Sequence, residues 1–203
     1  MCNFLLVNIY LLIDNLVNWI LSKDIMTKKE ALLMIAENKV RQGGYSNFSF
    51  RELAKEVGIK SASVHYHFPT KADLGAELAR RYADSFLSAL GDPDVIKVSG
   101  KHPIDVFIGL FQNALITDKQ MCLCGLLGAE SDSLPESVRL ETKHFFERNL
   151  VWLKTAYLSL GYSENSARYS AIKAISLLEG AMMVSKAVQD DALFLEMVTS
   201  VDR

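Results

Sequence analysis

The 203-residue sequence predicts an all-α protein. Apolar residues recur at the three- and four-residue spacing of amphipathic helices along most of the chain, and alternating strand patterns are absent. Capping signals and Gly or Pro fall between the periodic segments, and only 4 Pro interrupt the chain. Hydrophobic residues make up 50% of the sequence, which is enough to bury a substantial core.

The first two predicted helices lie near the N-terminal end. Residues 28–42 carry apolar side chains at helical spacing, and a pair of glycines ends this helix. Ser49 followed by Glu52 forms a capping box, which predicts the start of a second helix. Gly58 ends that helix and can take the positive φ that a tight turn needs.

A short third helix is predicted over residues 61–68, where Pro69 breaks the pattern. Thr70 and Asp73 then offer another capping box, for a helix that runs to about residue 90. Loop signals mark residues 91–94 and 99–103. The remaining helices are predicted over 104–117, 122–131, 136–160, 164–187 and 190–199.

Two helices joined by a very short, glycine-containing connection form a helix-turn-helix, whose second helix can enter a DNA major groove. Here the second helix of the pair has polar and ring-bearing side chains on its outward side or at its edges, namely Ser61, Ser63, His65, Tyr66 and His67. Such groups can bond phosphates or base edges. A solvated helix in an unrelated α-domain is the alternative interpretation.

The charge distribution supports a polyanionic partner at this end. Residues 26–81 carry ten Lys and Arg against six Asp and Glu, a local charge of +4, whereas the rest of the chain carries −6. The whole chain has a net charge of −2. A basic segment on an acidic body is the asymmetry expected of a nucleic-acid-binding protein, although a solvated basic face has the same composition.

The segment "FSFRELAKEVGIKSASVHYHFPTKADL" resembles the DNA-binding signature of the TetR family of bacterial transcriptional regulators. The diagnostic part is an aromatic-rich recognition helix that runs into Phe, a turn and Lys, here "SVHYHFPTKADL". The resemblance covers about residues 28–74. It implies an N-terminal three-helix DNA-binding domain and a C-terminal helical domain that binds a ligand and dimerises.

The resemblance assigns roles to individual positions. Ser63 matches a residue that bonds a phosphate, and Lys71 matches the family's phosphate-contacting lysine. Tyr66 and His67 match ring positions that touch the backbone or thymine methyl groups. Base-reading side chains vary at Ser61 and its neighbour.

Two further positions complete the predicted DNA-binding set. His65 departs from the family pattern, which most often has Tyr there, and it is included as a contact of the recognition helix. Arg51, on the second helix, is predicted to contact a phosphate.

The resemblance also implies a domain organisation and a function. Residues 26–74 form the DNA-binding domain, and residues 75–203 the effector-binding and dimerisation domain. The expected protein is a repressor that binds a palindromic double-stranded DNA operator as a homodimer, through helices at about 136–160 and 164–187. A small, mostly apolar effector would release it. The predicted effector-binding residues are Tyr82, Phe86, Phe107, Phe111, Met121, Cys122 and Cys124.

The cysteines are compatible with several interpretations. Cys2, Cys122 and Cys124 cannot form a disulfide framework, which suits a reducing cytoplasm. No Cys/His pair at zinc spacing accompanies them, so neither a metal nor a cofactor is predicted. The Cys-x-Cys pair is expected to be buried and to line the effector pocket, and a thiol-based sensor of electrophiles or oxidants is the alternative.

Residues 1–25 form an apolar N-terminal extension, with 14 apolar residues among positions 4–21. Asp14 and three Asn make a membrane span unfavourable, and a signal peptide is poorly matched. The open interpretations are natural translation from Met26, an amphipathic helix docked on the protein or a partner, and membrane association.

The sequence contains no clustered nucleophile and base, phosphate-binding loop or metal-ligand set, so an enzyme is not predicted. The competing class of function is a helical adaptor or lipid-binding protein that does not bind DNA.

Overall fold

The computed structural model describes residues 27–203, and the apolar extension lies outside these residues. The elements are α2 (Lys28–Gly43), η1 (Tyr45–Asn47), α3 (Phe50–Val57), α4 (Ser61–His67), α5 (Lys71–Leu90), α6 (Pro93–Val98), α7 (Pro103–Gln112), η2 (Asn113–Thr117), α8 (Leu123–Ala129), η3 (Ser131–Ser133), α9 (Glu136–Ser159), α10 (Glu164–Val188), α11 (Asp191–Met197) and η4 (Val198–Ser200). The all-α prediction is confirmed.

The structure has a helix, α6, that overlaps the first of the expected loops, 91–94, and ends before the second, 99–103. The sequence analysis missed this helix. Asp92 caps α6 by accepting hydrogen bonds from the backbone N–H groups of Asp94 and Val95. Pro93 occupies the first helical position, where its missing N–H costs nothing. The "GDPD" sequence, interpreted as a turn, is therefore a helix start.

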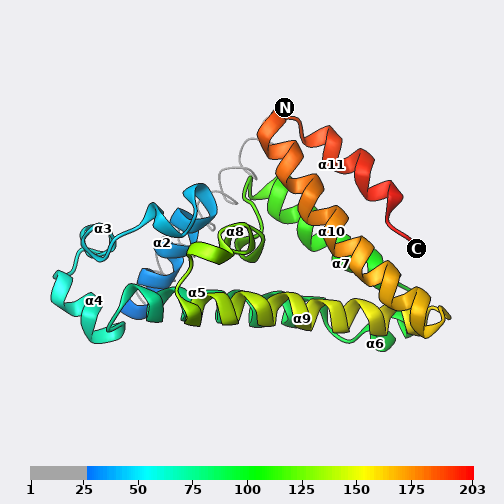
Figure 1. The fold of residues 1–203 in the computed structure, drawn as a ribbon, viewed down its shortest axis with the longest axis horizontal. Coiled ribbons are helices and arrows are strands. Elements are labelled where there is room, and N and C mark those ends of the chain that lie inside the picture. The colour runs from blue at the N-terminus through cyan, green and yellow to red at the C-terminus, as the bar shows by residue number, and fades with distance from the viewer. Residues whose placement is uncertain (1–26) are drawn as a thin grey trace, which may run out of the picture.

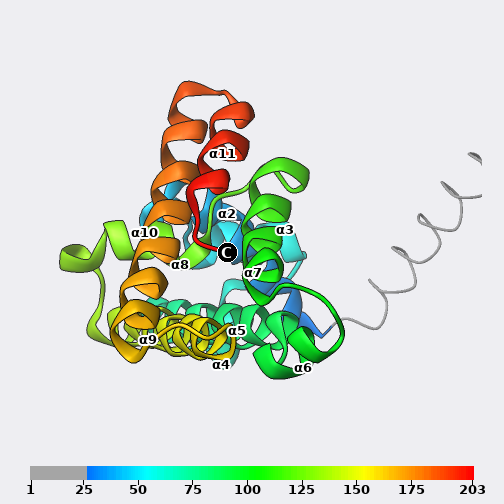
Figure 2. The same ribbon diagram turned by 90° about the vertical axis from the view of Figure 1, so that its right-hand side faces the viewer.

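The helices divide into two ends joined by long elements (Figure 1). α2, α3 and α4 form one end, and α10 and α11 rise from the other, while α5 and α9 run side by side along the molecule. α8 lies between the two ends. Turned by 90°, the molecule shows α10 and α11 as an adjacent pair, with α10 packed against α9 (Figure 2).

Two hydrophobic clusters stabilise these ends. The first joins α2, α3, α4 and the start of α5, with Leu32, Leu53 and Val64 fully buried. The second fills the larger domain around Phe107 and Phe145. Because α5 contributes to both clusters, it connects the two domains mechanically as well as covalently.

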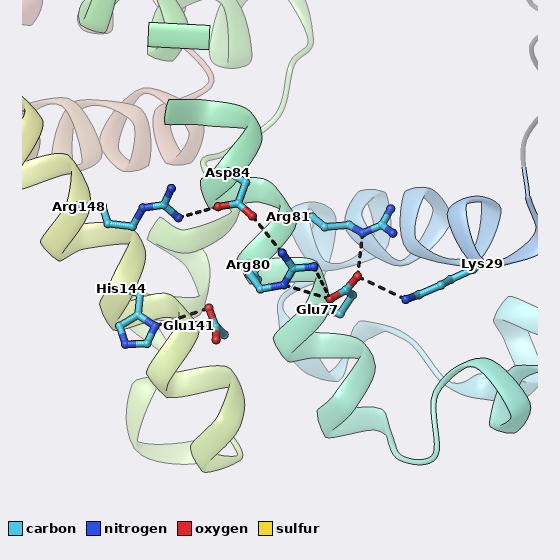
Figure 3. A network of polar contacts seen from close by, with 8 residues as sticks. All are labelled: Lys29, Glu77, Arg80, Arg81, Asp84, Glu141, His144 and Arg148. Carbon is cyan, nitrogen blue, oxygen red and sulfur yellow. Dashed lines mark hydrogen bonds and ion pairs between the residues drawn. The ribbon is translucent and has the colours of Figure 1, made fainter. Parts of the chain in front are cut away.

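A polar network spans α2, α5 and α9 on the surface (Figure 3). Glu77 accepts from Arg80 at 2.7 Å and Arg81 at 2.9 Å, and lies 3.5 Å from Lys29 on α2. Asp84 pairs with Arg80 at 3.1 Å and with Arg148 on α9 at 2.7 Å. Exposed pairs contribute little individually, but this network links three helices at the junction of the domains.

Across residues 27–203, none of the helices combines the length and apolar character that crossing a membrane requires.

Candidate nucleic-acid interface and effector cavities

α3 and α4 are joined by the tight turn that the sequence predicted. Gly58 has φ 73° and ψ 36°, a left-handed conformation that favours glycine. The backbone N–H of Ile59 donates to the Ala54 carbonyl at 2.9 Å, which closes the turn. Ala54 is buried, and its small side chain allows α3 to pack closely at this crossing.

α4 presents one face to the core and the other to solvent. Val64 and the capping residue Phe68 anchor it in the first hydrophobic cluster. On the other side, Ser61 is exposed and Tyr66 has 85% of its surface exposed, while Ser63 is half-buried. A phenol left in water on a well-anchored helix gains nothing for folding, so this side of α4 is available to a partner.

The two histidines of α4 differ in their contacts. His65 is exposed, but its Nδ1 lies 3.2 Å from the Pro69 carbonyl oxygen and its ring packs edge-on against Phe50. His67 is half-buried and stacks edge-on with Tyr66, with ring centroids 5.3 Å apart. The His65 ring thus also closes the α4–α5 turn, a structural role that the sequence analysis did not assign.

Lys71 is the first residue of α5, and its side chain lies against residues 45–48 of the DNA-binding end. Its ammonium donates to the Phe48 carbonyl at 2.7 Å and lies 4.8 Å from the Tyr45 ring centroid and 4.3 Å from that of Phe48. Partial burial lowers the pKa of Lys71. The predicted phosphate contact would have to use the remaining N–H groups of this ammonium.

Two neighbouring positions complete this surface. Arg51 is exposed on α3, as expected for a phosphate contact. Lys60, which precedes α4, is also exposed and was missed. The signal that could have found it is a basic residue directly before the recognition helix. Ser49 is committed to the predicted capping box, accepting from the backbone N–H of Glu52 and donating to its carboxylate.

The seven predicted effector-binding residues all belong to, or pack against, the second hydrophobic cluster. The Phe86 ring makes edge-on contacts with Phe107 and Phe111, at centroid distances of 5.7 Å and 5.6 Å. Met121, Cys122 and Cys124 are buried at the start of α8. The structure brings these residues into one close-packed cluster, so an effector entering there would have to displace side chains.

Tyr82 and Phe86 also line a hollow of about 520 Å³ between α2, α5 and α7. Arg41 lies in its wall, with its guanidinium 5.7 Å from the Tyr82 ring centroid. This hollow lies at the junction of the two domains.

A second hollow, of about 660 Å³, opens between α8, α9 and α10 and was not predicted. Its apolar wall includes Phe146, Leu150 and Ile175. Glu179 of α10 also lines it. Burial raises the pKa of this carboxyl to about 7, and a hydrogen bond with the Cys122 thiol lowers the pKa by a smaller amount. The sequence gives no signal that the Glu179 carboxyl is buried in a hollow, because a single Glu in a helical pattern is usually exposed.

The thiols at the start of α8 are in an unfavourable environment for ionisation. Burial raises the pKa of Cys122 and of Cys124 well above the usual value, and the Glu179 carboxyl raises both further. Since the thiolate is the reactive form, this environment favours packing over thiol chemistry. In residues 27–203, no group of His, Cys, Asp or Glu is arranged to hold a metal ion.

α10 presents an apolar row to solvent. Its exposed large side chains are Tyr169, Ile172, Met183, Val184 and Val188. α9 adds Leu140 and Val151. An apolar row of this length on long neighbouring helices is typical of a surface that packs against another chain.

Comparison with known proteins identifies both parts of the chain. The profile of bacterial regulatory proteins of the tetR family matches residues 35–78. The profile of the LmrA/YxaF-like transcriptional regulator C-terminal domain matches residues 104–200. No curated protein matches the chain.

Solved structures agree over nearly the whole described region. A TetR transcriptional regulator from Legionella pneumophila is 30% identical, with a TM-score of 0.76, over 87% of this chain and 96% of the other. A TetR-family regulator from Agrobacterium tumefaciens is 27% identical, with a TM-score of 0.71, over 87% and 98%. The reduced form of NemR from E. coli, at 20% identity and a TM-score of 0.70, covers 87% and 96% and shares the fold.

Proposed function

The chain belongs to the tetR family of bacterial regulatory proteins, and from that premise we propose that it is a dimeric repressor released from its operator by a small, mostly apolar effector. It is a transcriptional regulator with an LmrA/YxaF-like C-terminal domain. Regulators of this family are non-enzymatic DNA-binding proteins.

The exposed side of α4 carries the DNA-binding proposal. Its residues stand on a helix whose other side is anchored in the core, which is the geometry needed to enter a major groove without unfolding. The proposed contacts are those of Arg51, Ser61, Ser63, His65, Tyr66, His67 and Lys71. Lys60 is added to this set as a phosphate contact because it is exposed beside the same helix.

The proposed division into two domains follows the two hydrophobic clusters. Residues 26–74 would form the DNA-binding domain and residues 75–203 the effector-binding and dimerisation domain. The first cluster extends beyond residue 74 into α5 and α8, so the two domains share a packed boundary. That boundary gives an effector a means of moving the DNA-binding helices.

Dimerisation is proposed through α9 and α10, whose exposed apolar side chains need a partner surface. Pairing of two helices from each chain would bury this row in a four-helix interface. A two-fold dimer reads a palindrome, because each recognition helix meets an equivalent half-site. The effector is proposed to enter the C-terminal domain, where the aromatic cluster and the hollow of about 660 Å³ lie, with the hollow of about 520 Å³ at its junction with the DNA-binding domain.

Selection of binding sites from a random pool of double-stranded DNA tests this function. The proposal expects an inverted repeat to be enriched, and affinity to fall steeply with salt as phosphate contacts are screened. Sedimentation of the complex should give two chains per duplex. Failure to enrich any sequence, with affinity that is flat against salt, would instead favour the adaptor or lipid-binding alternative.

The thiol-sensing alternative is tested on the same operator. Cys122→Ser with Cys124→Ser should leave release by a non-reactive inducer in place. Oxidant-driven release that disappears in this double variant would establish the sensor, against the raised pKa of both thiols.

A further inference from the structure

The hollow between α8, α9 and α10 contains a carboxyl oxygen that has no hydrogen-bond partner in the part of the chain that the structure describes. Glu179 Oε1 is buried without a hydrogen-bond partner among the described residues. None of the ion pairs within residues 27–203 includes Glu179. A buried carboxyl with an unused acceptor is costly for folding, so its presence calls for an explanation, and a group on a bound ligand would supply one.

The cations nearest the mouth of the hollow are directed elsewhere. Arg139 and Lys143 line it, but their side chains pair within α9, Arg139 with Glu136 at 3.7 Å and Lys143 with Glu147 at 3.5 Å. Both basic side chains are largely exposed. The carboxyl of Glu179 therefore faces the hollow without a countercharge.

The space in front of this carboxyl depends on glycine. A Cβ atom on Gly125 would overlap Glu179 Oε2, and one on Gly128 would lie 3.2 Å from the Phe146 ring. The two glycines of α8 thus allow it to approach α9 and α10 closely while leaving Glu179 in the wall of the hollow. The rest of the wall combines apolar side chains, Phe146, Leu150 and Ile175 among them, with hydroxyl and charged groups that include Thr142, Ser176 and Asp132.

We propose that this hollow is the effector site, and that it binds an apolar organic molecule whose protonated amine pairs with the Glu179 carboxylate. The inference rests on the proposed function, since it names the class of effector and where it binds. A volume of about 660 Å³ suits a molecule of two aromatic rings or somewhat more. Dimerisation through α9 and α10 would cover part of the mouth and remove more of the bound molecule from water.

α8 connects this hollow to the DNA-binding domain. Immediately before α8, the Met121 carbonyl accepts a hydrogen bond from Arg41 Nε at 2.7 Å. Immediately after it, the Glu130 carboxylate accepts from the backbone N–H of Tyr45 at 3.0 Å. A ligand that pushes on the glycine face of α8 would therefore move α2 and η1, and with them the recognition helix.

Dibenzylamine and dibenzyl ether are suitable probes because they have nearly the same size and shape, and only the amine is cationic at neutral pH. Calorimetric titration of the full-length protein should show dibenzylamine binding more tightly than the ether. Glu179→Gln should weaken amine binding at least about tenfold, the effect of losing a charge-assisted hydrogen bond. Glu164→Gln, the same substitution elsewhere on α10, should leave amine binding unchanged.

Gly125→Ala provides a second variant that retains the carboxyl. Its Cβ should displace Glu179 and weaken amine binding. The inference is overturned if wild-type protein does not bind dibenzylamine, if Glu179→Gln binds it equally well, or if the ether binds as tightly.

Fluorescence anisotropy of labelled operator separates the two levels of the proposal. Ligand-free wild-type protein must first bind the operator, and failure at that step contradicts the proposed function itself. With operator binding intact, dibenzylamine should release DNA from wild-type protein at concentrations that leave Glu179→Gln bound. Glu179-dependent binding without release would overturn the effector role of the hollow.

Discussion

The DNA-binding end and the C-terminal domain differ in where stability and function lie. At the DNA-binding end, short helices of 8 and 7 residues are held by caps and a small core, and the proposed functional side chains lie outside that core. In the C-terminal domain, helices of 24 and 25 residues enclose both the aromatic cluster and the unpaired carboxyl of Glu179. The proposed function and folding are therefore separable at the DNA-binding end, whereas in the C-terminal domain the proposed effector site lies within the same packed helices that hold the fold together.

The largest effect is expected in the aromatic cluster. Phe145→Ala should lower the free energy of unfolding by about 3–5 kcal/mol, because a fully buried ring in contact with Tyr82 and Phe86 leaves a cavity. Denaturant unfolding monitored by circular dichroism measures this loss. A loss below about 1 kcal/mol would mean that the C-terminal domain is loosely packed, and the contrast between the two regions would fail.

Glu179→Gln should stabilise the protein at high pH. The folded pKa of about 7 lies above the ordinary value of 4.5, so the folded state holds this proton more strongly than the unfolded state. The stability this provides is fully present below about pH 4.5 and is lost as pH rises through 7, to an extent on the order of 3 kcal/mol. Because the Gln amide does not titrate, the unfolding free energy of the variant should not fall with pH in this way.

The titratable groups around Glu179 are the thiols of Cys122 and Cys124 at the start of α8, with Asp132, Arg139 and Lys143 also lining the hollow. Unfolding free energies of both proteins at pH 5 and pH 8 check the prediction. The gap between variant and wild type should widen with pH, and a constant gap would show that Glu179 is ionised throughout.

Lys71→Met keeps the length of the side chain while removing its charge. If one of its free N–H groups contacts a phosphate, the variant should bind all DNA sequences more weakly and to a similar extent. The slope of log affinity against log salt should fall by about one. Anisotropy titrations at several salt concentrations measure the slope, and an unchanged slope would restrict Lys71 to its contact with the Phe48 carbonyl.

Ser49→Ala tests whether caps support the DNA-binding end. Loss of the capping box at α3 should cost about 1 kcal/mol of stability. Thermal unfolding followed by circular dichroism is sufficient, with Ser46→Ala as a control on an exposed residue of η1. If the two substitutions lowered stability equally, the Ser49 cap would not contribute to the stability of α3.

The smallest effect on folding is expected at the recognition helix. Tyr66→Ala should change stability by less than about 0.5 kcal/mol, because the side chain is almost fully exposed. The same variant should lose operator affinity about tenfold, the range of one specific contact. A large loss of stability, or unchanged affinity, would break the separation of function from folding at this end.

The DNA-binding end was largely predictable because its signals are local. The capping boxes at Ser49 and Thr70 and the left-handed Gly58 determine helix boundaries within a few residues of sequence, and the structure has them as predicted. The contacts of Lys71 and His65 were not predictable. They depend on carbonyl groups at Phe48 and Pro69 that only the folded chain brings close.

The C-terminal domain was predictable as helices but not as a site. Apolar spacing located α9 and α10 almost to the residue, because long helices carry many repeats of the pattern. The partnership of Glu179 with Gly125 joins residues more than fifty positions apart, and no periodic signal records it. α6 was missed for the opposite reason, since Pro93 serves equally well in a turn and at a helix start.

The joint between the two domains has a consequence for recombination. Two hydrogen bonds cross this joint, from Arg41 Nε to the Met121 carbonyl and from the Tyr45 backbone N–H to the Glu130 carboxylate. Each uses one backbone group, and every residue type other than proline has both a carbonyl and an N–H. The side chains that these two hydrogen bonds require are Arg41 and Glu130, together with a glycine at position 44, where a Cβ would overlap the Glu130 carboxylate. The packed boundary also requires the apolar residues of the first cluster. A chimaera that exchanges the DNA-binding domain for that of a relative should therefore keep this connection if these three residues and the apolar residues of the shared cluster are retained. The proposed operator choice and the proposed effector choice would then be inherited independently.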